Sequence, residues 1–292
     1  MPELPDLEVY REALAARVAG QRIFAIDLRN PFVLRTAVPP IDAAIGKTVR
    51  DVRRLHKRIV FALDDDLFLV IHLMIAGRLV WLTAAKKPPG RITLATFKFE
   101  NGTLALTEAG TKRRASLHLV QGIVGLSQFD TGGLDVMRAS LEEFATRLAS
   151  ENHTVKNALT TPRLFSGIGN AYSDEILHRA RLSPLAMTQK QDRPAIAALY
   201  DATRVVLTEW TERLRNEAAG EFPEKVTAFQ PEMAVHGRYG QPCPVCGAPV
   251  QRIVYAENEC NYCARCQTGG VVLADRSLSR LLHKSYRRTL DE

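Results

Sequence analysis

The first residues of the chain place a possible nucleophile beside a proton carrier. The chain begins Met-Pro-Glu-Leu-Pro-Asp, and removal of Met1, which a small second residue favours, turns Pro2 into a secondary terminal amine. A terminal amine has a pKa of roughly 7.7 to 8.0, so a useful fraction is neutral and nucleophilic at physiological pH. Such an amine attacks carbonyl-like carbons to form Schiff bases, and the carboxyl of Glu3 can move the protons. The alternative is that Pro2 only stiffens a frayed chain end.

The five cysteines of the chain are confined to one short segment near its end. Two C-x-x-C pairs, Cys243 with Cys246 and Cys263 with Cys266, are separated by sixteen residues. This spacing is typical of a site in which four thiolates hold one structural zinc ion. Cys260 breaks the paired spacing and is expected to be a buried thiol rather than a ligand. A disulfide scaffold would instead spread its cysteines along a small secreted chain.

A third candidate group is the glycine-rich stretch Ser166-Gly-Ile-Gly-Asn170, which leads into a helical pattern over 171–177. Such a turn exposes backbone N–H groups at the positive end of a helix, and these bind a phosphate without reading a base. An ordinary tight turn between two helices is the alternative for a lone Gly-x-Gly.

The surrounding segments must hold these groups in place. Apolar residues recur at helical spacing directly after the chain start, at Leu7, Tyr10, Leu14 and Val18. This spacing predicts a buried helix that keeps the chain start still. Short apolar runs separated by turn residues predict antiparallel strands within 23–28, 58–63, 68–71, 79–82, 92–99 and 104–107. A glycine-containing stretch over 122–133 suits a hinge, and helical periodicity resumes over 141–159.

The composition fits an intracellular protein with a polyanionic partner. The chain has 292 residues, 46% of them hydrophobic, which is enough to fill the hydrophobic cores of several domains. Its formal net charge of +7 favours binding to a polyanionic partner. Basic residues gather in two predicted turns, at 53–58 around Lys57 and at 112–114 around Lys112 and Arg113. Two basic turns in one predicted β-sandwich indicate a track of cations that binds the phosphates of a nucleic acid. The alternative is that these basic residues only form a face exposed to water. No secretory signal is apparent and the most apolar run, over 67–76, is too short for a membrane span, so we expect a cytoplasmic, DNA-associated location and no membrane.

The three motifs, in this order, resemble those of the formamidopyrimidine-DNA glycosylase and endonuclease VIII family, whose members begin Met-Pro-Glu-Leu-Pro-Glu. The resemblance extends to Gln267. It implies an α+β fold with an N-terminal helix plus antiparallel β-sandwich, a helical domain with a helix-two-turns-helix, and a C-terminal zinc finger. We expect a catalytic domain over 1–125, a helical DNA-binding domain over 126–235, a finger over 236–270 and a basic amphipathic extension over 271–292, with DNA in the cleft between domains.

The resemblance implies an enzyme of base-excision repair that removes oxidised bases of the formamidopyrimidine or 8-oxoguanine type and then cleaves the strand. By this likeness Pro2 attacks the sugar, the resulting Schiff base allows β- and δ-elimination, Glu3 moves protons and Lys57 assists. The partner would be double-stranded damaged DNA. We further expect a monomer, one structural zinc ion and no nucleotide cofactor.

The resemblance also assigns DNA contacts. Phosphates would be held by Lys156 and Asn170, and Glu175 would brace the glycine-rich turn. An apolar wedge would come from Met74 or Ile75, which follow the His-Leu pair that begins at residue 72.

The chain also departs from the family pattern. Asp6 stands where the family has Glu, the loop over 107–115 lacks the expected phenylalanine, and Asn258 stands where relatives carry a phosphate-binding arginine. Residues 213–229, where relatives carry a mobile loop that can cover the extruded base, match poorly. These departures leave two alternatives open, namely a zinc protein that binds damaged or abasic DNA, or an AP lyase, each without base excision. The extension over 271–292 either packs on the protein or contacts DNA.

Overall fold

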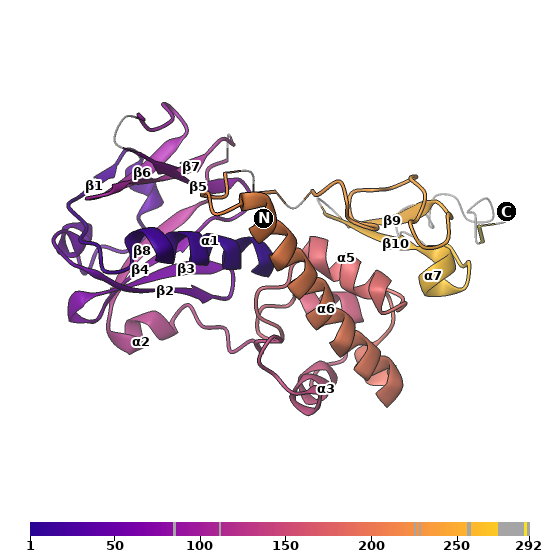
Figure 1. Ribbon diagram of the computed structural model, residues 1–292. Helices are drawn as coiled ribbons and strands as arrows, with labels where there is room; N and C mark the ends of the chain where they lie inside the picture. Colours follow the sequence, from indigo (N-terminus) through magenta and orange to yellow (C-terminus); the bar gives the residue numbers. More distant parts are fainter. Residues whose placement is uncertain are drawn as a thin grey trace. The chain divides into compact units, whose positions relative to one another are not determined.

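The computed structural model describes residues 1–83, 86–110, 112–224, 226–227, 229–255, 258–273 and 289–290. The chain forms two compact units, each made of two separate stretches of sequence. The first unit comprises Met1–Thr131 and Trp210–Ala228, and the second comprises Gly132–Glu209 and Phe229–Glu292 (Figure 1). This division is coarser than the four expected domains, whose boundaries stay proposals. Residues 274–288 of the basic amphipathic extension expected over 271–292, and the side chain of Asn258, lie outside the described residues.

Helix α1 (Leu4–Val18) opens the first unit. A capping box fixes its start, because the backbone N–H of Glu3 donates to Oδ2 of Asp6 at 2.8 Å while the Glu3 side chain receives the N–H of Asp6. The apolar residues that predicted the helix, from Leu7 to Val18, are fully buried. The helix packs beside strands β2 and β3 (Figure 1), so the prediction of a tethered chain start is confirmed.

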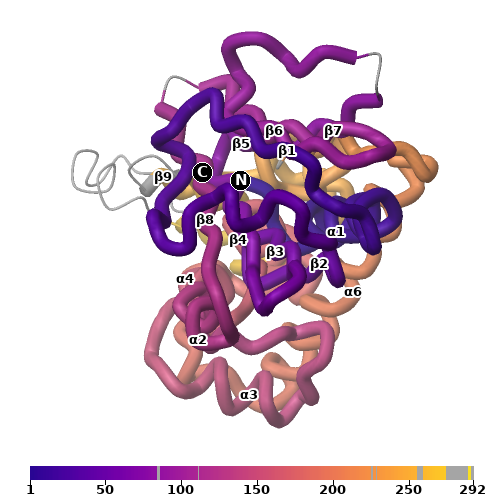
Figure 2. The backbone as a smooth tube through the Cα atoms, turned by 90° about the vertical axis from the view of Figure 1, so that its left-hand side faces the viewer, coloured from indigo at the N-terminus to yellow at the C-terminus, as the bar shows by residue number. Residues whose placement is uncertain are grey.

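Two antiparallel four-stranded sheets complete the sandwich (Figure 2). The first has the order β1 (Ala25–Leu28), β6 (Thr93–Phe99), β7 (Gly102–Glu108) and β5 (Gly77–Leu82). The second has the order β2 (Val49–Leu55), β3 (Arg58–Leu63), β4 (Leu67–His72) and β8 (Ser116–Gln121). Inward side chains of both sheets, such as Phe61 and Phe97, join those of α1 in one hydrophobic core.

Shorter elements connect these strands. Helix α2 (Gly122–Ser127) follows β8, so the stretch expected to be a hinge begins with a helical turn. The remaining short helices are η1 (Pro31–Val33), η2 (Ile41–Ala44), η3 (Asp64–Asp66) and, in the second unit, η4 (Thr188–Lys190).

The second unit is helical and ends in a small hairpin. Its helices are α3 (Leu141–Ala149), α4 (Val155–Thr160), α5 (Asn170–Arg179) and α6 (Arg193–Ala218), whose last residues belong to the first unit. Strands β9 (Val250–Tyr255) and β10 (Asn258–Cys263) pair antiparallel, and α7 (Ala264–Thr268) follows. The predicted fold class is therefore confirmed. Among the described residues, none of the helices combines the length and the apolar character that crossing a bilayer requires.

Residues 213–229 were expected to be a polar segment where relatives carry a mobile loop, but the described part of this segment is partly helical and partly buried. Helix α6 runs to Ala218, and the apolar side chains of Phe222 and Val226 enter the core of the first unit. The ring of Phe222 lies 5.7 Å from that of Tyr10 and 5.5 Å from the guanidinium of Arg17. These contacts anchor the segment to α1, because an aromatic ring gains from both burial and a cation over its face.

Candidate functional site

The chain start is enclosed by the first turn of α1. Pro2 is buried and Glu3 is 3% exposed. Burial lowers the pKa of the terminal amine, here that of Met1. Glu3 opposes this shift, and Arg78 and Lys57 add to it. A lowered pKa leaves more of the amine neutral, which is the form that attacks a carbon.

Asp6 is the unusual carboxyl of this site. Its Oδ2 accepts the backbone N–H of Glu3, whereas Oδ1 is buried and has no hydrogen-bond partner among the described residues. Burial raises the pKa of Asp6 to about 7. Asp6 also lines a cavity of about 610 Å³ between α1, Trp81 and the segment around Phe222. One of the departures from the family pattern, Asp6, therefore lies at a cavity wall.

Lys57 lies in the turn between β2 and β3, and the turn is built around His56. His56 adopts a φ of +54° and is 6% exposed, and its Nε2 lies 2.8 Å from Oδ1 of Asp130. Lys57 itself is half-buried, and it depresses the pKa of both the chain terminus and His72. Burial, followed by Arg58 and Lys57, lowers the pKa of His72 to about 4. The charge of Lys57 thus acts on the chain start, and its role in the chemistry stays a prediction.

The two candidate wedge residues, Met74 and Ile75, lie in the turn before β5 and differ in their exposure to solvent. Ile75 is 59% exposed, whereas Met74 is half-buried at a φ of +53°. The turn closes through Gly77, whose N–H donates to the Leu73 carbonyl at 2.9 Å; a Cβ on Gly77 would lie 2.3 Å from that oxygen. Arg78, which the sequence analysis missed, then caps the turn by donating to the Gly77 carbonyl at 2.7 Å and the Ile75 carbonyl at 3.2 Å.

The second basic turn is exposed and is shaped by a buried acid. Lys112 and Arg113 are exposed, and Arg113 donates to the Arg91 carbonyl at 2.8 Å. Glu108 is 2% exposed and accepts the backbone N–H groups of the two residues that follow Arg113, at 2.9 and 3.0 Å. The loop without the expected phenylalanine therefore presents cations at its tip.

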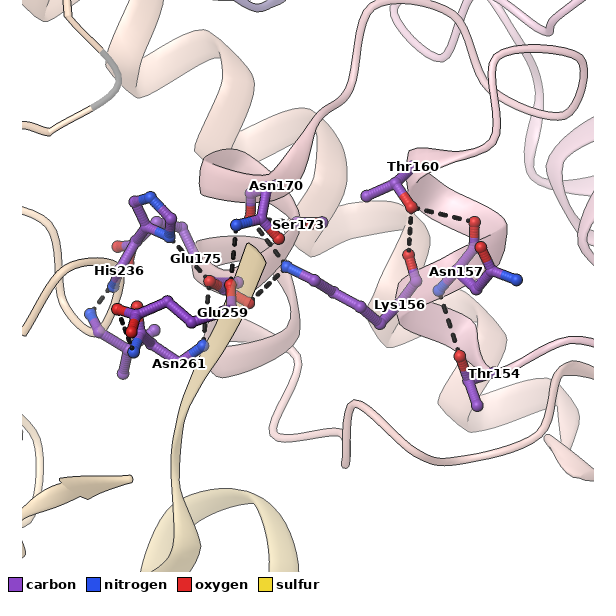
Figure 3. A network of polar contacts seen from close by, with 12 residues as sticks. Thr154, Lys156, Asn157, Thr160, Asn170, Ser173, Glu175, His236, Glu259 and Asn261 are labelled. Carbon is purple, nitrogen blue, oxygen red and sulfur yellow. Dashed lines mark hydrogen bonds and ion pairs between the residues drawn. The ribbon is translucent and has the colours of Figure 1, made fainter. Parts of the chain in front are cut away.

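The glycine-rich turn of the second unit lies beside a buried polar network (Figure 3). Lys156 donates from Nζ to the Asn170 carbonyl at 2.8 Å and to Oδ1 of Asp174 at 2.5 Å. Oδ2 of Asp174 lies 2.8 Å from Nδ1 of His236 and accepts the N–H of Asn261 at 3.1 Å. One buried carboxylate thus gathers donors from three segments, because a charge out of water needs partners. The structure brings Lys156 and Asn170 next to each other, and their predicted contacts with phosphates stay a prediction.

Glu175 has a different contact from the one expected. Its carboxylate accepts the backbone N–H groups of residues 234, 235 and 236 at 2.7, 2.9 and 2.9 Å. Burial raises the pKa of Glu175, and the three N–H groups oppose this shift. Glu175 therefore braces the segment that leads into the finger rather than the glycine-rich turn itself.

The four predicted ligands converge. The sulfurs of Cys243, Cys246, Cys263 and Cys266 all lie within 4.8 Å of one another. The sulfurs of a tetrahedral four-thiolate zinc site are about 3.8 Å apart, as follows from Zn–S bonds of about 2.3 Å. Separations of 3.9 Å between Cys243 and Cys266 and 3.4 Å between Cys246 and Cys263 fit that geometry. Cys260 stays outside the cluster, 2% exposed, and burial raises the pKa of its thiol.

Comparison with known proteins gives the class of the chain. The N-terminal domain of formamidopyrimidine-DNA glycosylase matches residues 1–115, its H2TH domain matches residues 135–217, and a zinc finger found in FPG and IleRS matches residues 240–269. The formamidopyrimidine-DNA glycosylase of Heliobacterium modesticaldum is 32% identical over 280 residues, covering 91% of this chain and 100% of the relative. An uncharacterized formamidopyrimidine-DNA glycosylase-like protein of Mycobacterium tuberculosis is 40% identical over 151 residues, covering 51% of this chain and 93% of that relative.

Solved structures agree with this class. The complex of Lactococcus lactis Fpg with DNA containing an abasic site has a TM-score of 0.81 at 26% identity, covering 91% of this chain and 99% of that one. The complex of the same enzyme with FAPY-dG containing DNA also gives 0.81 at 26% identity, covering 91% and 100%. The chain belongs to the formamidopyrimidine-DNA glycosylase family, and its four cysteines form the ligand set of one structural zinc ion.

Sequence reasoning missed the residues that organise the second unit. Asp174 and His236 are 62 positions apart, and no local pattern joins them. A weak signal existed for Asp174, because an acidic pair follows the glycine-rich turn. His178, whose Nε2 lies 3.3 Å from Sγ of Cys243, gave no signal at all.

Proposed function

We propose that this chain is a DNA glycosylase of base-excision repair with AP lyase activity, which removes oxidised bases of the formamidopyrimidine or 8-oxoguanine type from double-stranded DNA. Family membership supports the activity, and relatives of similar fold are bound to DNA with an abasic site or FAPY-dG. The observation that carries the proposal is the buried chain start. Pro2 and Glu3 lie at a capped helix terminus where burial favours a neutral amine.

The proposed reaction uses the processed terminus. The lone pair of the Pro2 nitrogen forms a bond to C1′ of the damaged nucleotide, and the bond from C1′ to the base breaks. The departing base takes the electron pair and a proton that Glu3 relays. The Pro2 nitrogen then loses its proton to Glu3, and its lone pair expels O4′ from C1′ while O4′ takes up a proton that Glu3 relays. The sugar ring opens, and the resulting iminium ion acidifies the C2′ protons. Loss of one of them expels the 3′ phosphate by β-elimination, and a second elimination expels the 5′ phosphate.

The DNA contacts follow the charge and exposure of the described side chains. Phosphates flanking the lesion are held by Lys156 and Asn170. In the first unit, Lys112 and Arg113 belong to a phosphate track with the basic turn around Lys57. Ile75 is the wedge, because it is more exposed than Met74, and an apolar side chain fills the gap left by an extruded nucleotide. The proposed protein is a cytoplasmic monomer that uses no nucleotide cofactor.

One observation favours an alternative, AP lyase activity without base excision. Phe222 is anchored against Tyr10 and Arg17, in the segment that by resemblance covers the extruded base. A segment fixed in this way has less freedom to enclose a base, whereas an abasic sugar needs no such cover.

Borohydride trapping separates the possibilities. Borohydride reduces the Schiff base and so joins protein and DNA covalently. A glycosylase with lyase activity is trapped on both 8-oxoguanine and abasic duplexes, a lyase alone only on the abasic duplex, and a binding protein on neither. Failure to trap on any duplex from a panel of oxidised purines, oxidised pyrimidines and abasic sites would contradict the proposal.

A further inference from the structure

His178 lies at the end of α5 that is nearest the metal ligands. Its side chain is 6% exposed, and Nε2 lies 3.3 Å from Sγ of Cys243. Among the described contacts, Nε2 of His178 is therefore a side-chain hydrogen-bond partner of Sγ of Cys243, which is one of the four predicted zinc ligands.

The charge of the metal site explains why a donor is useful there. Four thiolates around one Zn²⁺ leave a net charge of −2 in a small, partly buried volume. Such a charge is costly unless N–H groups point at the sulfurs. Partners behind the ligands orient them, and their removal typically weakens metal binding 10–100-fold. Cys243 is 2% exposed, so solvent contributes little at its sulfur.

Other hydrogen bonds join α5 to the same module. Gln267 accepts the N–H of Cys263 at 2.8 Å and donates to the Leu182 carbonyl, just beyond α5, at 2.8 Å. At the other end of α5, Asn170 donates from Nδ2 to the Glu259 carbonyl at 2.8 Å (Figure 3). Glu259 belongs to strand β10 (Asn258–Cys263), which ends at the ligand Cys263. The helix that begins at the glycine-rich turn is thus attached to the metal module along its length.

We propose that His178 is a positioning residue of the zinc site: its Nε2–H donates to the thiolate of Cys243 and thereby tightens metal binding and fixes the module on α5. The zinc part of this proposal is independent of the proposed function. Only the consequence for DNA rests on it, namely that the metal supports the phosphate-binding turn at the opposite end of the same helix.

Three variants of the full chain test the donor. His178→Phe keeps a ring of similar size without an N–H, and His178→Gln restores an N–H donor. His153→Phe is the matched control, because His153 belongs to the same unit and its Nε2 lies 2.7 Å from a carboxylate oxygen of Glu151 rather than near a cysteine. We expect zinc affinity, measured by competition with a chromophoric chelator, to fall 10–100-fold in His178→Phe. It should recover most of this loss in His178→Gln and stay unchanged in the control.

Cobalt substitution reports on the sulfur directly. Loss of a hydrogen bond to a thiolate makes that sulfur a better electron donor, so the sulfur-to-cobalt charge-transfer absorption of His178→Phe should move to lower energy. Unchanged zinc affinity together with an unchanged cobalt spectrum would overturn the proposal. Equal losses in the Phe and Gln variants would do so as well, since they would mean that only ring packing matters.

The unmutated protein supplies a measurement that no folding defect can obscure. In the zinc-loaded chain, long-range ¹H–¹⁵N NMR spectra identify which ring nitrogen of His178 carries the proton. A proton on Nε2 is expected. A neutral ring protonated on Nδ1 alone would leave Cys243 without this donor and would refute the assignment, whatever the DNA repair activity proves to be.

Discussion

The ammonium of Lys156 lies 2.5 Å from Oδ1 of Asp174, and the two side chains are 13% and 0% exposed. The same carboxylate lies 2.8 Å from Nδ1 of His236 through its second oxygen. Lys156 is therefore held by the protein before any DNA arrives. A phosphate that binds Lys156 meets an ammonium whose position is already fixed, which reduces the ordering cost of binding.

Removal of the Asp174 carboxylate should be strongly destabilising. Asp174→Ala leaves Lys156, His236 and the backbone N–H of Asn261 without their shared acceptor. Breaking a buried ion pair from one side costs about 3–5 kcal/mol, and denaturant titration should show a loss of that size in the free energy of unfolding. The matched control is Glu142→Ala, whose partner Arg193 is 81% exposed and whose loss should cost below about 0.5 kcal/mol. Equal effects of the two variants would contradict this account.

Lys156 itself should contribute one phosphate contact. In Lys156→Ala the slope of log affinity against log salt concentration should become shallower by about 0.9, because one fewer counterion is released. Binding should weaken on every duplex, damaged or not, since a phosphate carries no sequence information. Lys190, an exposed lysine of the same unit, provides the control variant Lys190→Ala. An unaltered slope in Lys156→Ala would exclude the contact.

The terminal amine should be needed for chemistry and not for DNA affinity. Pro2→Gly replaces a secondary amine by a primary one and frees the backbone at the start of α1. Borohydride trapping on an abasic duplex should be severely depressed, whereas salt-sensitive affinity for the same duplex should stay close to that of the unmutated chain. Trapping that persists undiminished would remove Pro2 from the mechanism. Mass spectrometry of the active protein supplies an independent check, because retention of Met1 would block the proposed nucleophile.

Asp6 should make the first unit less stable as the pH rises. Burial raises its pKa from 3.8 to about 7. Between these pH values the folded chain keeps a proton that the unfolded chain loses, so the free energy of unfolding falls with rising pH. The side chain of Asp6→Asn does not titrate. The difference between the free energy of unfolding of Asp6→Asn and that of the unmutated chain should therefore rise from about pH 4 to about pH 7, by up to about 4 kcal/mol.

Denaturant titration at a series of pH values measures this difference. The control is Asp27→Asn, whose carboxyl is 61% exposed. A difference between Asp6→Asn and the unmutated chain that stays flat across this range would show that Asp6 titrates normally in the fold.

Local patterns predicted the elements whose signal lies within a few residues. The spacing of Leu7, Tyr10 and Leu14 predicted α1, and paired cysteines predicted the metal ligands, because both depend on the geometry of one short segment. Strand β2 was missed, since its sequence Val-Arg-Asp-Val-Arg-Arg-Leu buries only two residues fully. With so few apolar residues, its sequence pattern could not distinguish a half-exposed strand from a basic turn.

Contacts between distant segments were beyond the reach of these patterns. Lys156 was assigned to DNA by resemblance. Its ion pair with Asp174 and the contact between His178 and Cys243 join residues 18 and 65 positions apart. Phe222 stands in a polar stretch, and only the fold shows that its ring completes a core built by residues near the chain start. Such pairings depend on the path of the whole chain, not on any local spacing.

The divided sequence of the first unit has a consequence during translation. Its core requires Phe222 and Val226, but the ribosome delivers them only after the residues between Thr131 and Trp210 have been made. At roughly 5–20 residues per second this interval lasts several seconds. For that time the nascent first unit lacks the ring of Phe222 that packs beside Tyr10, and apolar surface exposed in this way makes a nascent chain prone to aggregation.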